Sequence, residues 1–212
     1  MKALVLGATG AIGRDLVERL CVNPDFDEVD IFVRREVNIP SSKLKVHVVD
    51  FDHPESWAEN LSGDVLFLTM GTTLKAAGSQ AAQWKVDYTY QFEAAKAARA
   101  NGVEKLVLVS SVGANAHSKI FYSRMKGQLD DDAAKLGFPG CFILRPPSLI
   151  RKGSDRLGEK AGVAILKGLN AVGILRTWTP MPTEAVAEAM IRAAKSTLPG
   201  THIFTSQEIL SM

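Results

Sequence analysis

Two residues with complementary chemistry lie four positions apart in a stretch that predicts a helix over residues 122–136. Tyr122 and Lys126 share one face of that helix, because residues i and i+4 are neighbours on a helix surface. An ammonium beside a phenol favours the phenolate. The tyrosine could therefore act as a general acid when a carbonyl is reduced, or as a general base when an alcohol is oxidised.

A pair of serines precedes that helix. Ser110 and Ser111 follow an apolar stretch, residues 106–109, which predicts a buried strand. A hydroxyl at the carboxyl end of a strand could hold the substrate oxygen beside the phenol of Tyr122. Either Ser110 or Ser111 could supply this hydroxyl.

A glycine-rich segment follows the apolar residues 2–6, and its spacing is G-x-x-G-x-x-G. Gly7 permits a tight turn, Gly10 lets the backbone approach a pyrophosphate, and Gly13 lets a helix pack closely on the strand. The N-terminus of that helix would add free N–H groups and a partial positive charge. The segment predicts a pyrophosphate site formed by Gly7, Ala8, Thr9, Gly10, Ala11, Ile12 and Gly13.

Two arginines, Arg34 and Arg35, end the next predicted strand, residues 29–33. In dinucleotide folds an acid at this strand end binds the 2′-hydroxyl of NAD, whereas an arginine accommodates the 2′-phosphate of NADP. A planar guanidinium binds phosphate through two hydrogen bonds. The sequence therefore favours NADP(H) and leaves NAD(H) open; two solvated surface charges are the alternative interpretation.

The following strand, residues 45–49, ends in Asp50 and Phe51. The carboxylate could accept a hydrogen bond from the adenine amino group, and the phenyl ring could flank the adenine. An ordinary turn explains these residues equally well.

Strands and helices alternate through the first two thirds of the chain, and the strands are apolar on both faces. This pattern predicts a doubly wound parallel α/β sheet of Rossmann type. We expect a dinucleotide-binding core over residues 1–150, and a small substrate or lid region over 151–212 that completes the same domain. The expected strands are 2–6, 29–33, 45–49, 64–69, 106–109, 141–144 and 202–204, and the expected helices are 12–20, 56–61, 80–100, 122–136 and 184–195.

Composition excludes several classes of protein. The 212 residues carry a net charge of +2 with no dense basic cluster, so nucleic acid is not an expected partner. No apolar run approaches the ~20 residues of a membrane-spanning helix. The four histidines have no partners at metal-ligand spacing. Two cysteines far apart in sequence, Cys21 and Cys141, suggest a reduced, cytoplasmic setting.

Taken together, these segments resemble an atypical short-chain dehydrogenase/reductase of the NAD(P)H-binding type, most closely its Tat-interacting-protein-like oxidoreductase group. The resemblance covers most of residues 4–150, and its most group-specific parts are residues 71–73 and 144–146. The matching segments are residues 4–10, 33–35, 48–51, 71–73, 86–88, 109–114, 122–127 and 144–146.

The resemblance implies roles for further residues. Asp50 and Phe51 would meet the adenine. Lys126 would also hold the nicotinamide ribose, and Tyr122 would transfer the proton. Ser111 would be the catalytic serine, with Ser110 as the alternative. Met70, Gly71 and Thr72 would pass close to a ribose, Pro146 to Leu149 would border the nicotinamide, and Arg156 would touch cofactor or substrate.

The implied function is an NADP(H)-dependent oxidoreductase that acts on a small carbonyl or alcohol substrate. The main alternative is an NADPH-binding sensor with little turnover; epimerase or dehydratase chemistry, which would favour tightly held NAD, fits the two arginines less well. Asp87 lies where extended relatives often have asparagine, which puts an asparagine-based proton relay in doubt. Residues 130–132, all aspartates, are interpreted as a solvated helix face.

The apolar stretch 161–175 could form a lid helix, a dimer face or a membrane-surface helix. The first two fit it better, because it holds a single charge, Lys167, and so lacks a basic face. A homodimer therefore remains open.

Overall fold

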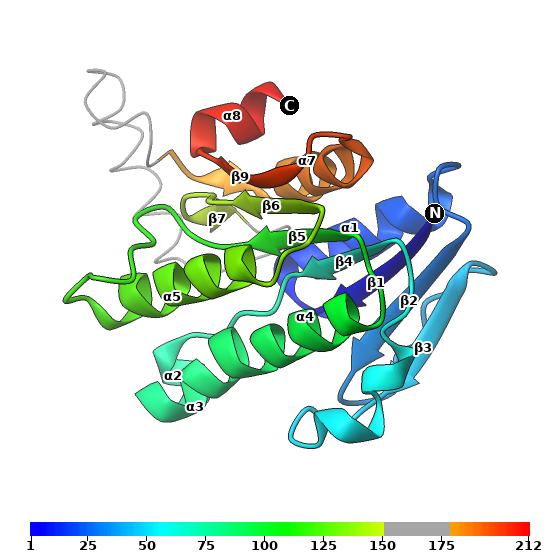
Figure 1. Ribbon diagram of the computed structural model, residues 1–212, viewed down its shortest axis with the longest axis horizontal. Coiled ribbons are helices and arrows are strands. Elements are labelled where there is room, and N and C mark those ends of the chain that lie inside the picture. Colours follow the sequence, from blue (N-terminus) through cyan, green and yellow to red (C-terminus); the bar gives the residue numbers. More distant parts are fainter. Residues whose placement is uncertain (151–178) are drawn as a thin grey trace.

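The computed structural model describes residues 1–150 and 179–212 of the chain. Seven parallel strands form one sheet, in the spatial order β3-β2-β1-β4-β5-β6-β9 (Figure 1). This sheet confirms the predicted doubly wound α/β fold. The strands are β1 (Lys2–Leu6), β2 (Glu28–Val33), β3 (Leu44–Val48), β4 (Val65–Leu68), β5 (Lys105–Val109), β6 (Gly140–Leu144) and β9 (Gly200–Phe204).

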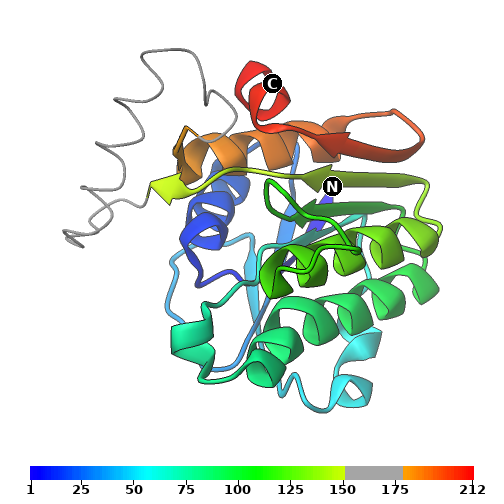
Figure 2. The same cartoon turned by 90° about the vertical axis from the view of Figure 1, so that its left-hand side faces the viewer.

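Helices cover both faces of the sheet (Figure 2). Successive side chains of a strand point to opposite faces, so β1 contributes to two cores. Ala3 and Val5 pack in one core with residues of α1 (Ala11–Val22) and α7 (Thr183–Lys195). Leu4 and Leu6 pack in the other with residues of α4 (Tyr90–Ala100) and α5 (Phe121–Lys135).

The helix expected over residues 80–100 is divided. It begins as α3 (Gln80–Trp84), passes through a π-helical segment η3 (Lys85–Thr89) and continues as α4. The short helix expected over 56–61 is instead two 3-10 turns, η1 (Pro54–Ser56) and η2 (Ala58–Asn60).

Four short elements were not expected. They are α2 (Leu74–Ala77), α8 (Ser206–Ser211), and the paired strands β7 (Leu149–Ile150) and β8 (Met181–Pro182). The sequence did carry a signal for α8, because Thr205 and Glu208 form a capping box at its start.

The chain returns to the sheet after residue 178. Strand β9 pairs with β6 at one edge, and α7 packs against α1. In the ranges 1–150 and 179–212, no helix is long and apolar enough to cross a membrane. The segment 161–175 lies outside the described residues.

Candidate functional site

The glycine-rich loop joins β1 to α1 and needs glycine at two positions. Gly7 has φ +87°, and a Cβ there would lie 2.6 Å from the backbone nitrogen of Met70. A Cβ on Gly13 would lie 2.1 Å from the carbonyl oxygen of Gly7. Strand, loop and helix therefore approach each other more closely than any larger residue allows.

The N-terminus of α1 is open to an anion. Its N-cap residue, Gly10, has no side chain to accept the first N–H groups, and the first turn holds no acidic residue. Two hydrogen bonds fix the loop itself. The Gly10 N–H donates to the Gly7 carbonyl at 2.8 Å, and Arg14 Nε donates to the Thr9 carbonyl at 3.1 Å. A fixed backbone with free N–H groups suits a phosphate.

A cavity of about 440 Å³ lies over this loop. Nine of the predicted cofactor residues line it: Gly7, Ala8, Thr9, Gly10, Arg34, Phe51, Met70, Gly71 and Thr72. The structure therefore gathers residues from the carboxyl ends of β1, β2 and β4, and from the turn after β3, around one space.

Other predicted cofactor residues do not line the cavity: Ala11, Ile12, Gly13, Arg35, Asp50, Tyr122, Lys126, Pro146 and Leu149. Ile12 is buried in the core. Asp50 is exposed, and its carboxylate accepts a hydrogen bond from the Asp52 N–H at 2.9 Å. Pro146 is buried, Leu149 is half-buried, and Arg156 lies outside the described residues.

Eight further residues line the cavity that the sequence did not single out as cofactor contacts. They are Phe32, Val33, Thr69, Ala76, Ala77, Ala82, Val86 and Tyr90. Four of them belong to α2, α3 and η3: Ala76, Ala77, Ala82 and Val86. No local motif marks them, since only the tertiary fold brings these elements to the end of β3.

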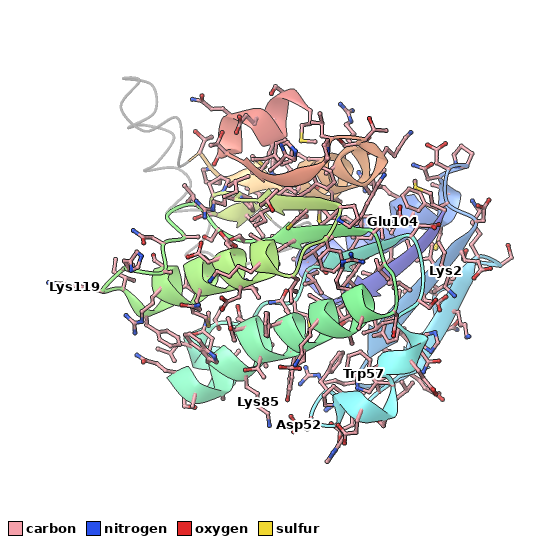
Figure 3. All side chains as sticks on the ribbon, in the orientation of Figure 1. Lys2, Asp52, Trp57, Lys85, Glu104 and Lys119 are labelled. Atoms are coloured by element: carbon pink, nitrogen blue, oxygen red, sulfur yellow. The ribbon has the colours of Figure 1, made fainter. Side chains whose placement is uncertain are left out.

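Lys85 in η3 and Tyr90 in α4 connect this part of the cavity to Asp52, in the turn after β3. The Tyr90 hydroxyl donates to Asp52 Oδ1 at 2.5 Å, and Lys85 Nζ lies 2.6 Å from the same oxygen; Figure 3 labels Lys85 and Asp52 close together. The hydrogen bonds from Lys85 and Tyr90 hold the pKa of Asp52 below its ordinary value. The rings of Phe51 and Tyr90 have centroids 5.5 Å apart, so two aromatic residues meet in the cavity wall.

Tyr122 and Lys126 lie in the first turns of α5. Tyr122 is 40% exposed, whereas Lys126 is 3% exposed. The loop before α5 folds back on the helix: the Asn115 N–H donates to the Ser123 carbonyl at 3.0 Å, and a Cβ on Gly127 would lie 2.2 Å from the Ala116 nitrogen. The short connection from Ser111 to Tyr122 is therefore packed against α5.

The two candidate serines differ in their surroundings. Ser111 is half-buried, and its hydroxyl donates to the Val112 carbonyl at 3.3 Å. Ser110 is buried, and its hydroxyl favours the charged form of Asp130. Of the two hydroxyls, that of Ser111 is therefore the more accessible.

Asp130 is buried, and the expectation of a solvated face is wrong for this residue. Its Oδ2 accepts hydrogen bonds from Arg145, with Nη2 at 2.8 Å and Nε at 2.9 Å. Burial raises the pKa of the Asp130 carboxyl, against the opposing effects of Ser110, Arg145 and Lys126. Asp131 is exposed as expected. Burial of Asp130 follows from α5 packing against β6, which places Arg145 beside it.

Asp87, in η3, connects the cavity to Lys126. Its Oδ2 accepts a hydrogen bond from the Thr72 N–H at 2.8 Å, and its Oδ1 lies 3.8 Å from Lys126 Nζ. Burial raises the pKa of the Asp87 carboxyl, opposed by the charge of Lys126 and the Thr72 N–H. Among the residues described, no three His, Cys, Asp or Glu side chains are grouped to hold a metal ion.

Several solved structures share this fold. MoeE5 in complex with UDP-glucose and NAD aligns with a TM-score of 0.73 at 16% identity, over 100% of this chain and 80% of that one. UDP-glucose 4-epimerase from Thermotoga maritima aligns with a TM-score of 0.71 at 16% identity, over 100% and 81%. At these identities the likeness shows the fold alone.

Two curated relatives are considerably more similar to this chain in sequence than these solved structures are. The mitochondrial protein FMP52-1 of Scheffersomyces stipitis is 36% identical over 92% of this chain and 88% of its own length. The mitochondrial protein FMP52 of Candida albicans is 35% identical over 94% and 90%.

The predicted cytoplasmic location is contradicted by these relatives, because their names assign them to mitochondria. Two unpaired cysteines indicate a reducing environment at most, and they do not distinguish one reducing compartment from another.

A family model described as NAD(P)H-binding matches residues 7–137, which include the glycine loop, most of the cavity wall and the Tyr122–Lys126 pair. The narrower resemblance to the Tat-interacting-protein-like group stays a prediction. The chain therefore belongs to the NAD(P)H-binding family and is a relative of the FMP52 proteins.

Proposed function

We propose that this protein is an NADP(H)-dependent oxidoreductase that interconverts a small carbonyl compound and the corresponding alcohol. An NAD(P)H-binding Rossmann domain fits an oxidoreductase. The observation that carries the proposal is the cavity over the glycine loop, which is lined by Gly7, Arg34 and Phe51.

The residues around the cavity fit a dinucleotide. The glycine loop and the uncapped N-terminus of α1 suit the pyrophosphate, and Phe51 with Tyr90 provides an aromatic wall for the adenine. Arg34 lines the cavity whereas Arg35 does not, so we assign the 2′-phosphate chiefly to Arg34. This arginine supports a preference for NADP(H) over NAD(H).

The reacting groups would come from β5 and α5. When bound, the nicotinamide supplies or accepts the hydride. In the direction of reduction, Ser111 would donate a hydrogen bond to the carbonyl oxygen, and Tyr122 would give that oxygen its proton. The Lys126 ammonium would stabilise the phenolate that remains and hold the nicotinamide ribose. Tyr122 is sufficiently exposed to recover a proton from solvent.

The substrate region would be small. We place it within residues 151–212, of which α7 and β9 also complete the core and the sheet. Residues 1–150 would form the cofactor core, with Pro146 and Leu149 bordering the nicotinamide and Arg156 touching cofactor or substrate. A substrate region of this size would enclose a small molecule. It would also fit a cleft that a second copy of the chain completes.

Turnover separates this proposal from a cofactor-binding sensor. With NADPH and a panel of aldehydes, ketones and quinones, wild-type protein should consume cofactor with at least one compound. Tyr122→Phe should abolish that consumption and leave NADPH affinity unchanged. NADPH binding without any consumption across the panel would favour the sensor, and full turnover by Tyr122→Phe would remove this residue from the mechanism.

A further inference from the structure

Asp87 is buried behind Lys126, and the chemistry proposed above does not use its carboxyl group. Its side chain is 0% exposed. One oxygen, Oδ2, is bound by the Thr72 N–H, whereas Oδ1 has no hydrogen-bond partner among the described residues. A buried anion is costly unless a cation compensates it, and Oδ1 faces Lys126 Nζ at 3.8 Å.

The backbone is altered at the same place. Asp87 is the central residue of η3, the π-helical segment between α3 and α4. Such segments often occur at functional sites, because they hold a side chain that a regular helix would direct elsewhere. The side chain of the buried Gln91 donates to the Asp87 carbonyl at 2.7 Å, so the main chain of this residue is also fixed.

The other buried acid near Lys126, Asp130, already has a cation partner in Arg145, although its Oδ1 lacks a hydrogen-bond partner among the described residues. Asp130 lies one turn further along α5 and influences Lys126 electrostatically. However, both Arg145 contacts bind its Oδ2, at 2.8 and 2.9 Å. Asp87, by contrast, has Lys126 as its single cation within ion-pair distance among the described residues.

We propose that Asp87 is a positioning residue for Lys126, holding its ammonium where the nicotinamide ribose would bind. The Thr72 N–H couples this position to the cavity wall, so the cofactor site and the ammonium keep a fixed relation. This inference rests on the proposed function, in which Lys126 contacts the nicotinamide half of the cofactor. It predicts that loss of the carboxylate affects that half and spares the adenosine half.

Two probes separate the halves of the site. NADP⁺ fills both the adenosine half and the nicotinamide half of the site, whereas 2′,5′-ADP lacks the nicotinamide and its ribose. By calorimetric titration, Asp87→Asn should bind NADP⁺ at least about ten-fold more weakly than wild type, because the Lys126 ammonium would no longer be held for its hydrogen bond to the ribose. Its affinity for 2′,5′-ADP should be unchanged. Asp131→Asn, an exposed acid on α5, is the matched control and should alter neither affinity.

An equal loss for both probes would mean that Asp87 supports the whole cavity through Thr72, and would overturn the inference. Unchanged NADP⁺ affinity in Asp87→Asn would overturn it as well. Failure of the wild type to bind either probe is a separate result, which would refute the proposed function and this inference with it.

A double-mutant cycle with Lys126→Met makes the test independent of how well one variant folds. In the Lys126→Met background, Asp87→Asn should have no further effect on NADP⁺ affinity, because the group it positions is absent. If Asp87→Asn alone fails to fold, the double variant should recover the fold, since both buried charges are then removed. A full additional loss of affinity, or a double variant that remains unfolded, would contradict the proposal.

Discussion

Arg145 binds Asp130 through two nitrogens, Nη2 at 2.8 Å and Nε at 2.9 Å, and thereby links the end of β6 to the middle of α5. Asp130 is 1% exposed. This ion pair holds α5, the helix that carries Tyr122 and Lys126, against the end of β6.

Replacing Arg145 by methionine should destabilise the protein strongly. The variant leaves a buried carboxylate without its cation, which costs about 3–5 kcal/mol of unfolding free energy. Asp130→Asn combined with Arg145→Met should regain most of this loss in urea unfolding experiments at pH 7. If the double variant is as unstable as the single one, packing of the arginine stem rather than charge explains the effect.

The same carboxyl should make stability depend on pH. Burial raises the pKa of Asp130, so its contribution to folding is complete below about pH 4, near the ordinary value of aspartate, and is lost as pH rises through the folded-state pKa. Wild type should therefore lose stability relative to Asp130→Asn as the pH is raised from about 4. Thermal unfolding of both proteins over a pH series measures the difference; a constant difference would contradict the assignment.

Substitutions at Gly7 and Gly102 can separate the cost of backbone strain from the cost of a steric clash. Both have positive φ, +87° and +89°, but a Cβ meets neighbours at 2.6 Å only at Gly7, while nothing lies within 4 Å at Gly102. Gly102→Ala should cost only about 1–2 kcal/mol, the penalty of a left-handed residue. Gly7→Ala should cost clearly more or prevent folding. Equal losses in urea unfolding would show that the loop can open to admit a side chain.

The two arginines after β2 should differ in their effect on cofactor choice. Arg34 lines the cavity and Arg35 does not. Arg34→Ala should weaken NADPH binding by about 10- to 100-fold, the range for hydrogen bonds to a charged group, with little change for NADH. Arg35→Ala serves as the control and should change neither by much. Equal losses of NADPH and NADH affinity in Arg34→Ala would refute the contact with the 2′-phosphate.

Sequence patterns predicted the sheet and the glycine loop because both depend on local requirements. Short apolar runs such as residues 65–68 favour a buried strand, and the approach of Gly13 to Gly7 leaves no room for a larger residue. The expected helix over 80–100 was correct in extent, but its apolar and polar residues did not reveal the π segment around Asp87.

Other parts of the site depend on contacts between distant segments. Asp130 and Asp131 are chemically identical neighbours, yet only Asp130 faces Arg145 and is buried. Tyr90 enters the cavity wall because the start of α4 passes the turn after β3, where Asp52 binds its hydroxyl. Neither residue carries a local signal of its position.

The proposed function depends most directly on the cavity over the glycine loop being a dinucleotide site. Isothermal titration calorimetry of the full chain with NADPH and with NADH tests this in one experiment. We expect one molecule of NADPH to bind per chain, with weaker binding of NADH. No heat of binding with either nucleotide, from protein shown to be folded, would contradict the proposed function.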